Sequence, residues 1–154
     1  MSIFNLQEGG TRDHAESTLV DSKEGGYPEY NSFGITPAYG INCKYVRGLR
    51  IANVVTDYQI TDSRPAFYFQ DSEDVSLSAI QAKVSDQAPA YIRFNNQNGA
   101  IIMNSRPRSG KVPFCGFEGK TKDITIMNND LRKAKAPYVG LVEVDVKEIS
   151  VSGF

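Results

Sequence analysis

Few residues in this 154-residue chain could carry acid–base or metal chemistry. The only histidine, His14, lies in a polar stretch without a second histidine, and a general acid or base needs a partner that orients it. We therefore expect His14 to be a solvated loop residue. Three nearby carboxylates, Asp71, Glu73 and Asp74, could bind a cation. A solvated turn before Val75 is the simpler interpretation, so we expect no metal site.

The composition excludes several classes of partner. The net charge is −1, from 17 basic and 18 acidic residues, which gives no electrostatic footprint for nucleic acid or an anionic membrane. No apolar run reaches the roughly 18 residues of a membrane span, and Met1–Glu8 lacks the pattern of an export signal. We expect no nucleic-acid partner, no membrane partner and no cofactor.

The elements that would position any site come from a repeat. One segment recurs five times without gaps, and its first apolar residues are 26, 25, 24 and 25 positions apart. Each copy has a glycine or an acidic residue, then two apolar residues two positions apart, then Asn or a small residue. This period is typical of a strand whose alternate side chains face one core. The copies are Gly48–Asn53, Asp74–Ala79, Gly99–Asn104, Asp123–Asn128 and Glu148–Gly153.

A proline marks a second strand in each repeat. Pro65, Pro89, Pro113 and Pro137 are 24 residues apart, and Pro37 precedes Pro65 by 28. Proline cannot donate a ladder hydrogen bond, so it belongs at the first residue of a strand or in the bend before it. Each repeat therefore holds at least two strands.

These features predict an all-β fold, a right-handed parallel β-helix of about five coils with about 24–25 residues each. A leucine-rich repeat has a similar length, but its Asn comes three residues after the last strand leucine. Here Asn53, Asn104 and Asn128 come two residues after an isoleucine. We expect these asparagines to form a structural ladder from coil to coil, interrupted at Ala79.

The chain is expected to be one domain, with residues 1–36 as a partial N-terminal coil and a long loop, and residues 37–154 as the coils. Ser2–Leu6 resembles the pattern of Ile51–Val54, so the chain is expected to begin inside a coil and to leave an open sheet edge. An upstream polypeptide half or a homo-oligomer would cap this edge. The loop Gln7–Phe33 is expected to line a binding face.

The two cysteines, Cys43 and Cys115, lie about three coils apart, which is roughly 14 Å at the spacing of strands. A disulfide needs Cα atoms within about 7 Å. We therefore expect two free, buried thiols.

Five segments carry a more specific signal: Glu8–Glu16, Tyr27–Glu29, Phe33–Gly34, Pro37–Gly40 and Asp62–Ala66. Together they resemble the C-terminal half of bacterial polygalacturonase-like proteins, glycoside hydrolase family 28. The resemblance spans nearly all the chain and is most specific in residues 8–66. It implies a pectin-lyase-like β-helix that acts on pectic or related polysaccharides or oligosaccharides in a groove along one face, in the bacterial periplasm or outside the cell.

The chemistry that the resemblance implies is inverting hydrolysis, with one carboxylic acid and one carboxylate. The family motifs are Asn-x-Asp, Asp-Asp, Gly-His and Arg-x-Lys, in that order. The sequence contains no Asp-Asp, Gly-His or Arg-x-Lys, and Asn128-Asn129-Asp130, which matches the first motif, is interpreted as a turn. We expect no catalytic residue in this chain, whose status as an enzyme is left open.

Four residues of the family-like segments are of types that handle acidic sugars: Tyr27, Glu29, Tyr39 and Arg64. Arginine offers a two-pronged fork to a carboxylate, and an aromatic ring can face a sugar ring. We expect these four to bind substrate. Three further arginines, Arg93, Arg106 and Arg108, are expected to be surface residues.

The leading hypothesis is a C-terminal β-helix portion of a pectin-degrading glycoside hydrolase that is not catalytic by itself. The alternative is a carbohydrate-binding or structural β-helix module that acts on its own, as a single chain or as an oligomer. A third hypothesis is an active enzyme that uses other acids, such as Glu29 and Asp62.

Overall fold

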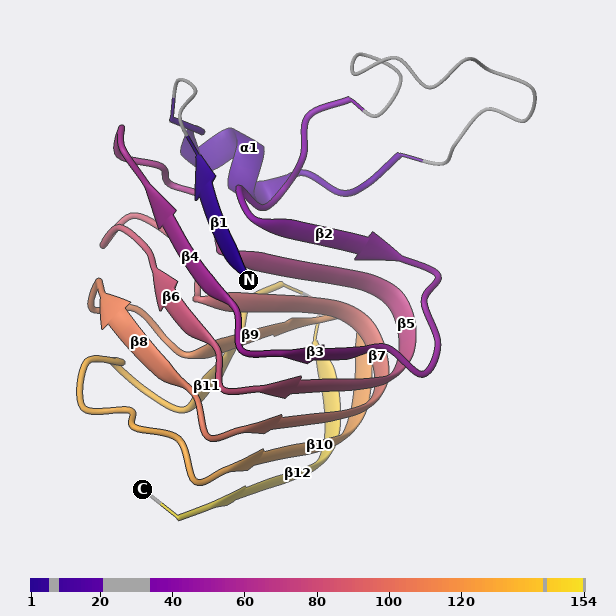
Figure 1. Ribbon diagram of the computed structural model, residues 1–154. Helices are drawn as coiled ribbons and strands as arrows, with labels where there is room; N and C mark the ends of the chain where they lie inside the picture. Colours follow the sequence, from indigo (N-terminus) through magenta and orange to yellow (C-terminus); the bar gives the residue numbers. More distant parts are fainter. Residues whose placement is uncertain (6–8, 21–33, 143, 154) are drawn as a thin grey trace.

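The computed structural model describes residues 1–5, 9–20, 34–142 and 144–153. The described strands all pair in parallel and wind into a right-handed solenoid of about four turns (Figure 1). The predicted fold class, a parallel β-helix, is confirmed.

The described residues contain one short helix and twelve strands. Their bounds are β1 (Ser2–Asn5), α1 (Arg12–Glu16), β2 (Ile41–Lys44), β3 (Arg50–Ala52), β4 (Val55–Tyr58), β5 (Phe67–Ser78), β6 (Gln81–Lys83), β7 (Ile92–Met103), β8 (Arg106–Ser109), β9 (Cys115–Glu118), β10 (Lys120–Met127), β11 (Tyr138–Gly140) and β12 (Asp145–Ser152). No described helix is long and apolar enough to cross a membrane.

The strands belong to two sheets. A four-stranded sheet has the order β1-β4-β6-β8, and the other eight strands form a second sheet. The 12-residue strands β5 and β7 curve in the middle, so the eight-stranded sheet covers two sides of the solenoid (Figure 1). The four-stranded sheet forms the remaining side.

The register of the strands is the register of the sequence repeat. Leu77 pairs with Ile51 in the turn before and with Ile102 in the turn after, and Ile126 continues the same column. The gapless alignment of the five copies is therefore confirmed. At the N-terminus the pattern was misleading, because Ser2 pairs with Val55 and so β1 extends the strand that follows the Ile51 segment.

Two corners of each turn use residues in the left-handed region. The first column is Gly48, Asp74, Gly99, Asp123 and Glu148, and the second is Asn53, Ala79, Asn104, Asn128 and Gly153, all with φ between 51° and 77°. Glycine, asparagine and aspartate adopt this conformation at the lowest cost. The corners explain why glycine, asparagine or aspartate stands at eight of these ten positions, Ala79 and Glu148 being the exceptions. The predicted ladder of asparagine side chains stays a prediction.

The core is a column of side chains inside the solenoid. The rings of Phe69 and Phe94 stack with centroids 5.3 Å apart, and Phe117 follows Phe94 at 5.8 Å. Both cysteines are free, as predicted, with Cys115 wholly buried and Cys43 half-buried. Burial raises the pKa of both thiols.

The recurring prolines stand in the bends before β5, β7, β9 and β11, where they were expected. Their carbonyl groups still connect neighbouring turns. The carbonyls of Pro65, Pro113 and Pro137 each accept a backbone N–H from the turn before, at 3.1 Å. Proline therefore removes one N–H donor at the bend, but the backbone hydrogen bonds between neighbouring turns are kept.

The solenoid has about four turns where five coils were expected. The reason lies in the four-stranded sheet, which ends at β8. In the last described turn, residues 129–153, strands form only in the eight-stranded sheet. In that incomplete turn no described strand pairs with the outer edge of β8.

Candidate functional site

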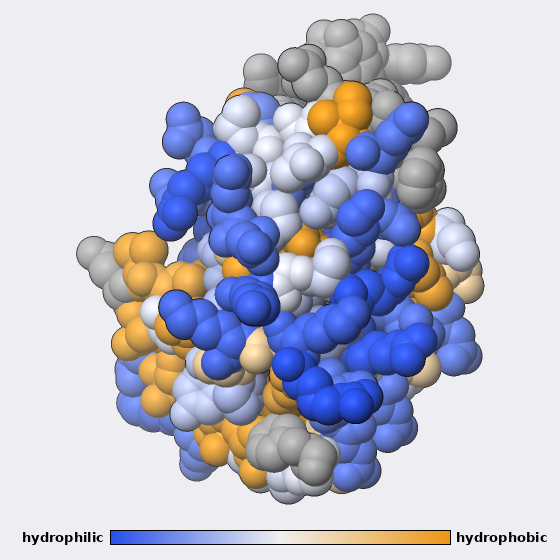
Figure 2. Space-filling view, turned by 90° about the vertical axis from the view of Figure 1, so that its left-hand side faces the viewer, coloured by the Kyte–Doolittle hydropathy of each residue, from blue (hydrophilic) through white to orange (hydrophobic). Residues whose placement is uncertain are grey.

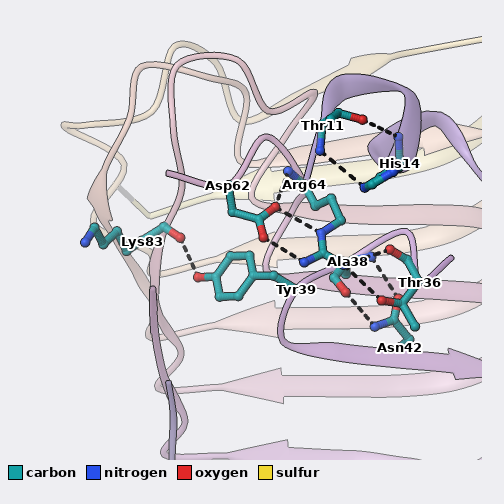
Figure 3. Close-up of polar contacts among 9 residues, drawn as sticks. All are labelled: Thr11, His14, Thr36, Ala38, Tyr39, Asn42, Asp62, Arg64 and Lys83. Atoms are coloured by element: carbon teal, nitrogen blue, oxygen red, sulfur yellow. Dashed lines mark hydrogen bonds and ion pairs between the residues drawn. The ribbon is translucent and has the colours of Figure 1, made fainter. Parts of the chain in front are cut away.

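Three of the segments that carry the family resemblance, Glu8–Glu16, Pro37–Gly40 and Asp62–Ala66, meet at one place on the solenoid in their described residues (Figure 3). Ser63 N donates to the carbonyl of Gly10 at 2.8 Å, which joins the N-terminal loop to the bend before β5. Within that bend, Arg64 forms an ion pair with Asp62, with two contacts of 2.7 and 3.0 Å. The Nη1 group of Arg64 donates to Thr36, at 3.2 Å to its carbonyl and 3.0 Å to its hydroxyl.

The Asp62–Arg64 ion pair is buried and has a structural role. The Asp62 side chain has no exposed surface, and that of Arg64 is 13% exposed. Burial opposes ionisation of Asp62, but the hydrogen bonds from Arg64 and from Gly10 N outweigh it and lower the pKa of Asp62 below its usual value. Because both sides of the guanidinium are engaged, Arg64 holds the loop on the scaffold. Its predicted contact with substrate stays a prediction.

Tyr39 is also engaged inside the protein. Its residue surface is 8% exposed, and its hydroxyl donates to the carbonyl of Lys83 at 2.5 Å and lies 2.9 Å from Thr56 Oγ1 (Figure 3). Burial raises the pKa of Tyr39 well above its usual value. The ring packs edge-on against Tyr58, with centroids 5.4 Å apart. The other two predicted binding residues, Tyr27 and Glu29, lie outside the described residues.

His14 belongs to a helix, so its predicted setting in a loop was wrong. The Thr11 hydroxyl accepts from His14 N at 3.4 Å, and Thr11 N donates to His14 Nδ1 at 3.3 Å. This reciprocal pair is the capping box of α1, with the imidazole in the place that Glu or Gln usually takes. The ring of His14 therefore satisfies a backbone donor.

Arg93 is buried, so its predicted place on the surface was wrong. Its guanidinium forms a two-pronged pair with Glu118, at 2.5 and 2.8 Å, and lies 4.6 Å from the ring centroid of Tyr68. Its remaining prong donates to the carbonyl of Ala15 and, at 3.0 Å, to that of Ser17. The pair therefore attaches the C-terminal end of α1 to the outer face of β7 and β9.

Further hydrogen bonds join the N-terminal loop to the eight-stranded sheet. Lys44 Nζ donates to the carbonyl of Leu19 at 3.0 Å, and Leu19 N donates to Gln70 Oε1 at 3.0 Å. The described part of the N-terminal loop thus lies across the outer face of the eight-stranded sheet, at strands β2, β5, β7 and β9. Polar side chains on that face bind the backbone of the loop.

The acidic run is a corner of the solenoid. Asp74 pairs with Arg50 at 2.8 Å, and Glu73 pairs with Arg47 at 3.4 Å. These carboxylates therefore face different cations. The part of the chain that the structure describes holds no group of three His, Cys, Asp or Glu side chains placed to bind a metal ion.

Arg106 and Arg108 are exposed, as predicted, but they belong to a cluster that sequence reasoning missed. They lie along β8 and face the segment 130–135 across a hollow of about 470 Å³. We call this feature the basic groove. It opens on the side of the molecule formed by the four-stranded sheet, where hydrophilic side chains gather in Figure 2. A signal was present, because Lys83, Arg108 and Lys133 are 25 residues apart, one repeat each.

The comparisons with known proteins add no relative. No family model matches the chain, and neither a curated protein nor a solved structure matches it.

Proposed function

We propose that this chain is a β-helix portion of a glycoside hydrolase that acts on pectic or related polysaccharides, and that it binds polysaccharide without catalysis of its own. The observation that carries the proposal is the convergence of Gly10, Thr36 and the Asp62–Arg64 bend. These residues are far apart in the sequence and lie in or next to the segments with the family resemblance. Their mutual contacts are what a shared, family-like scaffold would require.

The carboxylates at this place support a role in structure over a role in catalysis. Inverting hydrolysis needs an acid and a base on opposite sides of the scissile bond, about 6.5–9.5 Å apart, with room for a water molecule. Asp62 is buried and bound by Arg64, and Glu118, at 8% exposure, is bound by Arg93. Neither is free to transfer a proton to a substrate. Acids with these contacts brace the loop.

The test is reducing-sugar release from polygalacturonate by the purified chain, measured beside its binding to the same polymer. We expect binding without release of new reducing ends. Release that disappears in Glu29→Gln or Asp62→Asn would support the third hypothesis and overturn the non-catalytic proposal. A catalytically active polygalacturonase serves as the positive control for the assay.

One observation favours the alternative of a module that associates with further coils or with a second copy. Within the described residues, β2 and β3 pair only with β5, so their other edges are open. Open edges are templates for pairing with another strand. Light scattering after size exclusion tests this: a dimer that dissociates when Ala52, whose N–H faces the open edge of β3, is replaced by proline would support association through the edge, and a monomer at all concentrations would contradict it.

A further inference from the structure

The basic groove arises from the incomplete last turn. The segment after β10 meets the turn of β8 at two backbone hydrogen bonds, from Asp130 N to the carbonyl of Ser105 and from Lys135 N to that of Val112, both 2.9 Å. Between these bonds the segment closes a turn of its own, with Ala134 N donating to Leu131 O at 2.9 Å. It therefore lies beside β8 without extending the sheet, and a hollow remains between them.

The groove continues at both ends. A hollow of about 310 Å³ near the Asn104 and Asn128 corners shares Arg106 and Asp130 with the central one. On the other side, a hollow of about 700 Å³ near Lys111 shares Arg108, Arg132 and Lys133 with it. The three hollows follow residues 104–111, a path of about 25 Å at strand rise. A groove that is open at both ends suits a linear polymer better than a small anion.

The charge of this face differs from that of the whole protein. Seven cations lie in or beside the groove, and three carboxylates lie among them; these ten residues are Lys83, Arg106, Arg108, Lys111, Arg132, Lys133, Lys135, Asp57, Asp86 and Asp130. The rest of the chain then has 10 basic and 15 acidic residues, from totals of 17 and 18. The basic face is therefore a local feature on an otherwise acidic molecule.

Several of the groove cations form no ion pair with a described carboxylate. Asp57 binds both Lys83 and Arg108, at 2.9 and 3.1 Å, and Asp130 binds Arg132 at 2.7 Å. By contrast, Arg106 donates to the neutral Gln81 amide at 3.0 Å. Among the described residues, no carboxylate lies within 4 Å of the charged groups of Arg106, Lys111, Lys133 and Lys135. These four are available to an anionic ligand.

The lining also indicates what kind of polyanion fits. The residues that line the three hollows include no Phe, Tyr or Trp. Single-stranded nucleic acids are held largely by stacking of bases on aromatic rings. Guanidinium forks pair well with carboxylates, and the side chains of Gln81 and Asn104 can hydrogen-bond to hydroxyl groups. Carboxylates on a hydroxyl-rich polymer match this lining.

We propose that the basic groove is a binding site for a uronate-bearing polysaccharide, which lies along β8 and is held by Arg106, Lys111, Lys133 and Lys135. The site is distinct from the Asp62–Arg64 bend and lies further along the solenoid, because Ser63 bonds Gln87 one turn on and Asp86 bonds Lys111 one turn beyond that. The class of polymer is taken from the proposed function. The new inference says where on the protein the polymer binds and that binding depends on the charges of the groove.

The experiment compares two triple variants with the unmodified chain. Arg106→Gln/Lys111→Gln/Lys133→Gln removes three groove charges, and Arg12→Gln/Arg47→Gln/Lys147→Gln removes three exposed charges elsewhere. The two variants have the same net charge, and circular dichroism and thermal unfolding check that both fold. Binding to polygalacturonate, a neutral galactan and single-stranded DNA is measured by titration calorimetry at several salt concentrations.

We expect the unmodified chain to bind polygalacturonate and not galactan, and the groove variant to bind it about tenfold or more weakly with a shallower salt dependence. The control variant should change by less than about threefold. Equal binding of polygalacturonate by both variants would show that the groove is not the binding site, and it would not contradict the proposed function. Absence of polygalacturonate binding by the unmodified chain would overturn both, and groove-dependent binding of DNA alone would overturn the uronate assignment.

Discussion

The pair between Arg93 and Glu118 gives the sharpest prediction about how the N-terminal loop is held. The two side chains are 4% and 11% exposed, so Arg93→Met would leave a buried carboxylate without its partner. Removal of one partner of a buried ion pair costs about 3–5 kcal/mol. In a protein of this size about 1 kcal/mol corresponds to roughly 2–4 °C, so we expect the melting temperature to fall by about 6–20 °C.

The same substitution should loosen a defined segment. Arg93 donates to the carbonyls of Ala15 and Ser17, so Arg93→Met should increase hydrogen exchange over residues 12–19 more than in the core strands. Arg47→Met is the matched control, because the Arg47 side chain is 79% exposed in its pair with Glu73 and its loss should cost less than about 1 kcal/mol.

Urea unfolding followed by circular dichroism measures the change, and Arg93→Met/Glu118→Gln completes the test. The double variant should recover part of the lost stability, because it no longer buries an unpaired charge. If Arg93→Met were no more destabilised than Arg47→Met, or if residues 12–19 kept their protection, the proposed attachment would be refuted.

Three further predictions concern the scaffold. Ala79→Asn should raise the melting temperature by about 2–4 °C, because asparagine tolerates the φ of 53° at this corner better than alanine does; an unchanged or lower value would argue against corner strain. The Asp62 carboxylate, whose pKa is lowered in the folded state, should contribute stability that is present above its unfolded value of about 3.9 and is lost as the pH falls through its folded value. Urea unfolding should therefore show a steeper loss of stability below about pH 4 in the unmodified chain than in Asp62→Asn, and parallel pH profiles would contradict this. Iodoacetamide should modify Cys43 faster than Cys115 in the folded protein, as measured by mass spectrometry, whereas equal rates would mean that Cys115 is not buried.

The solenoid could be predicted from the sequence because one physical constraint recurs in every turn. Each corner needs a residue that tolerates positive φ, and each strand needs alternate apolar residues, so Asp74, Leu77 and Ala79 have counterparts about 25 residues away. A repeated constraint of this kind leaves a visible period. The start of β1 was misaligned because a four-residue strand holds too few positions to fix a register.

The loop contacts and the groove were harder to predict for a different reason. Arg93 and Ala15 are 78 residues apart, and nothing in either local pattern indicates that they meet. The basic groove depends on where the four-stranded sheet stops, which the period itself does not show. Only the spacing of Lys83, Arg108 and Lys133 contained a trace of it.

The most direct test of the proposed function is one titration of polygalacturonate into the unmodified chain, with reducing ends assayed in the same sample afterwards. We expect saturable binding that weakens with added salt and produces no new reducing ends. Absence of binding, or hydrolysis that depends on Asp62 or Glu29, would contradict a non-catalytic polysaccharide-binding β-helix.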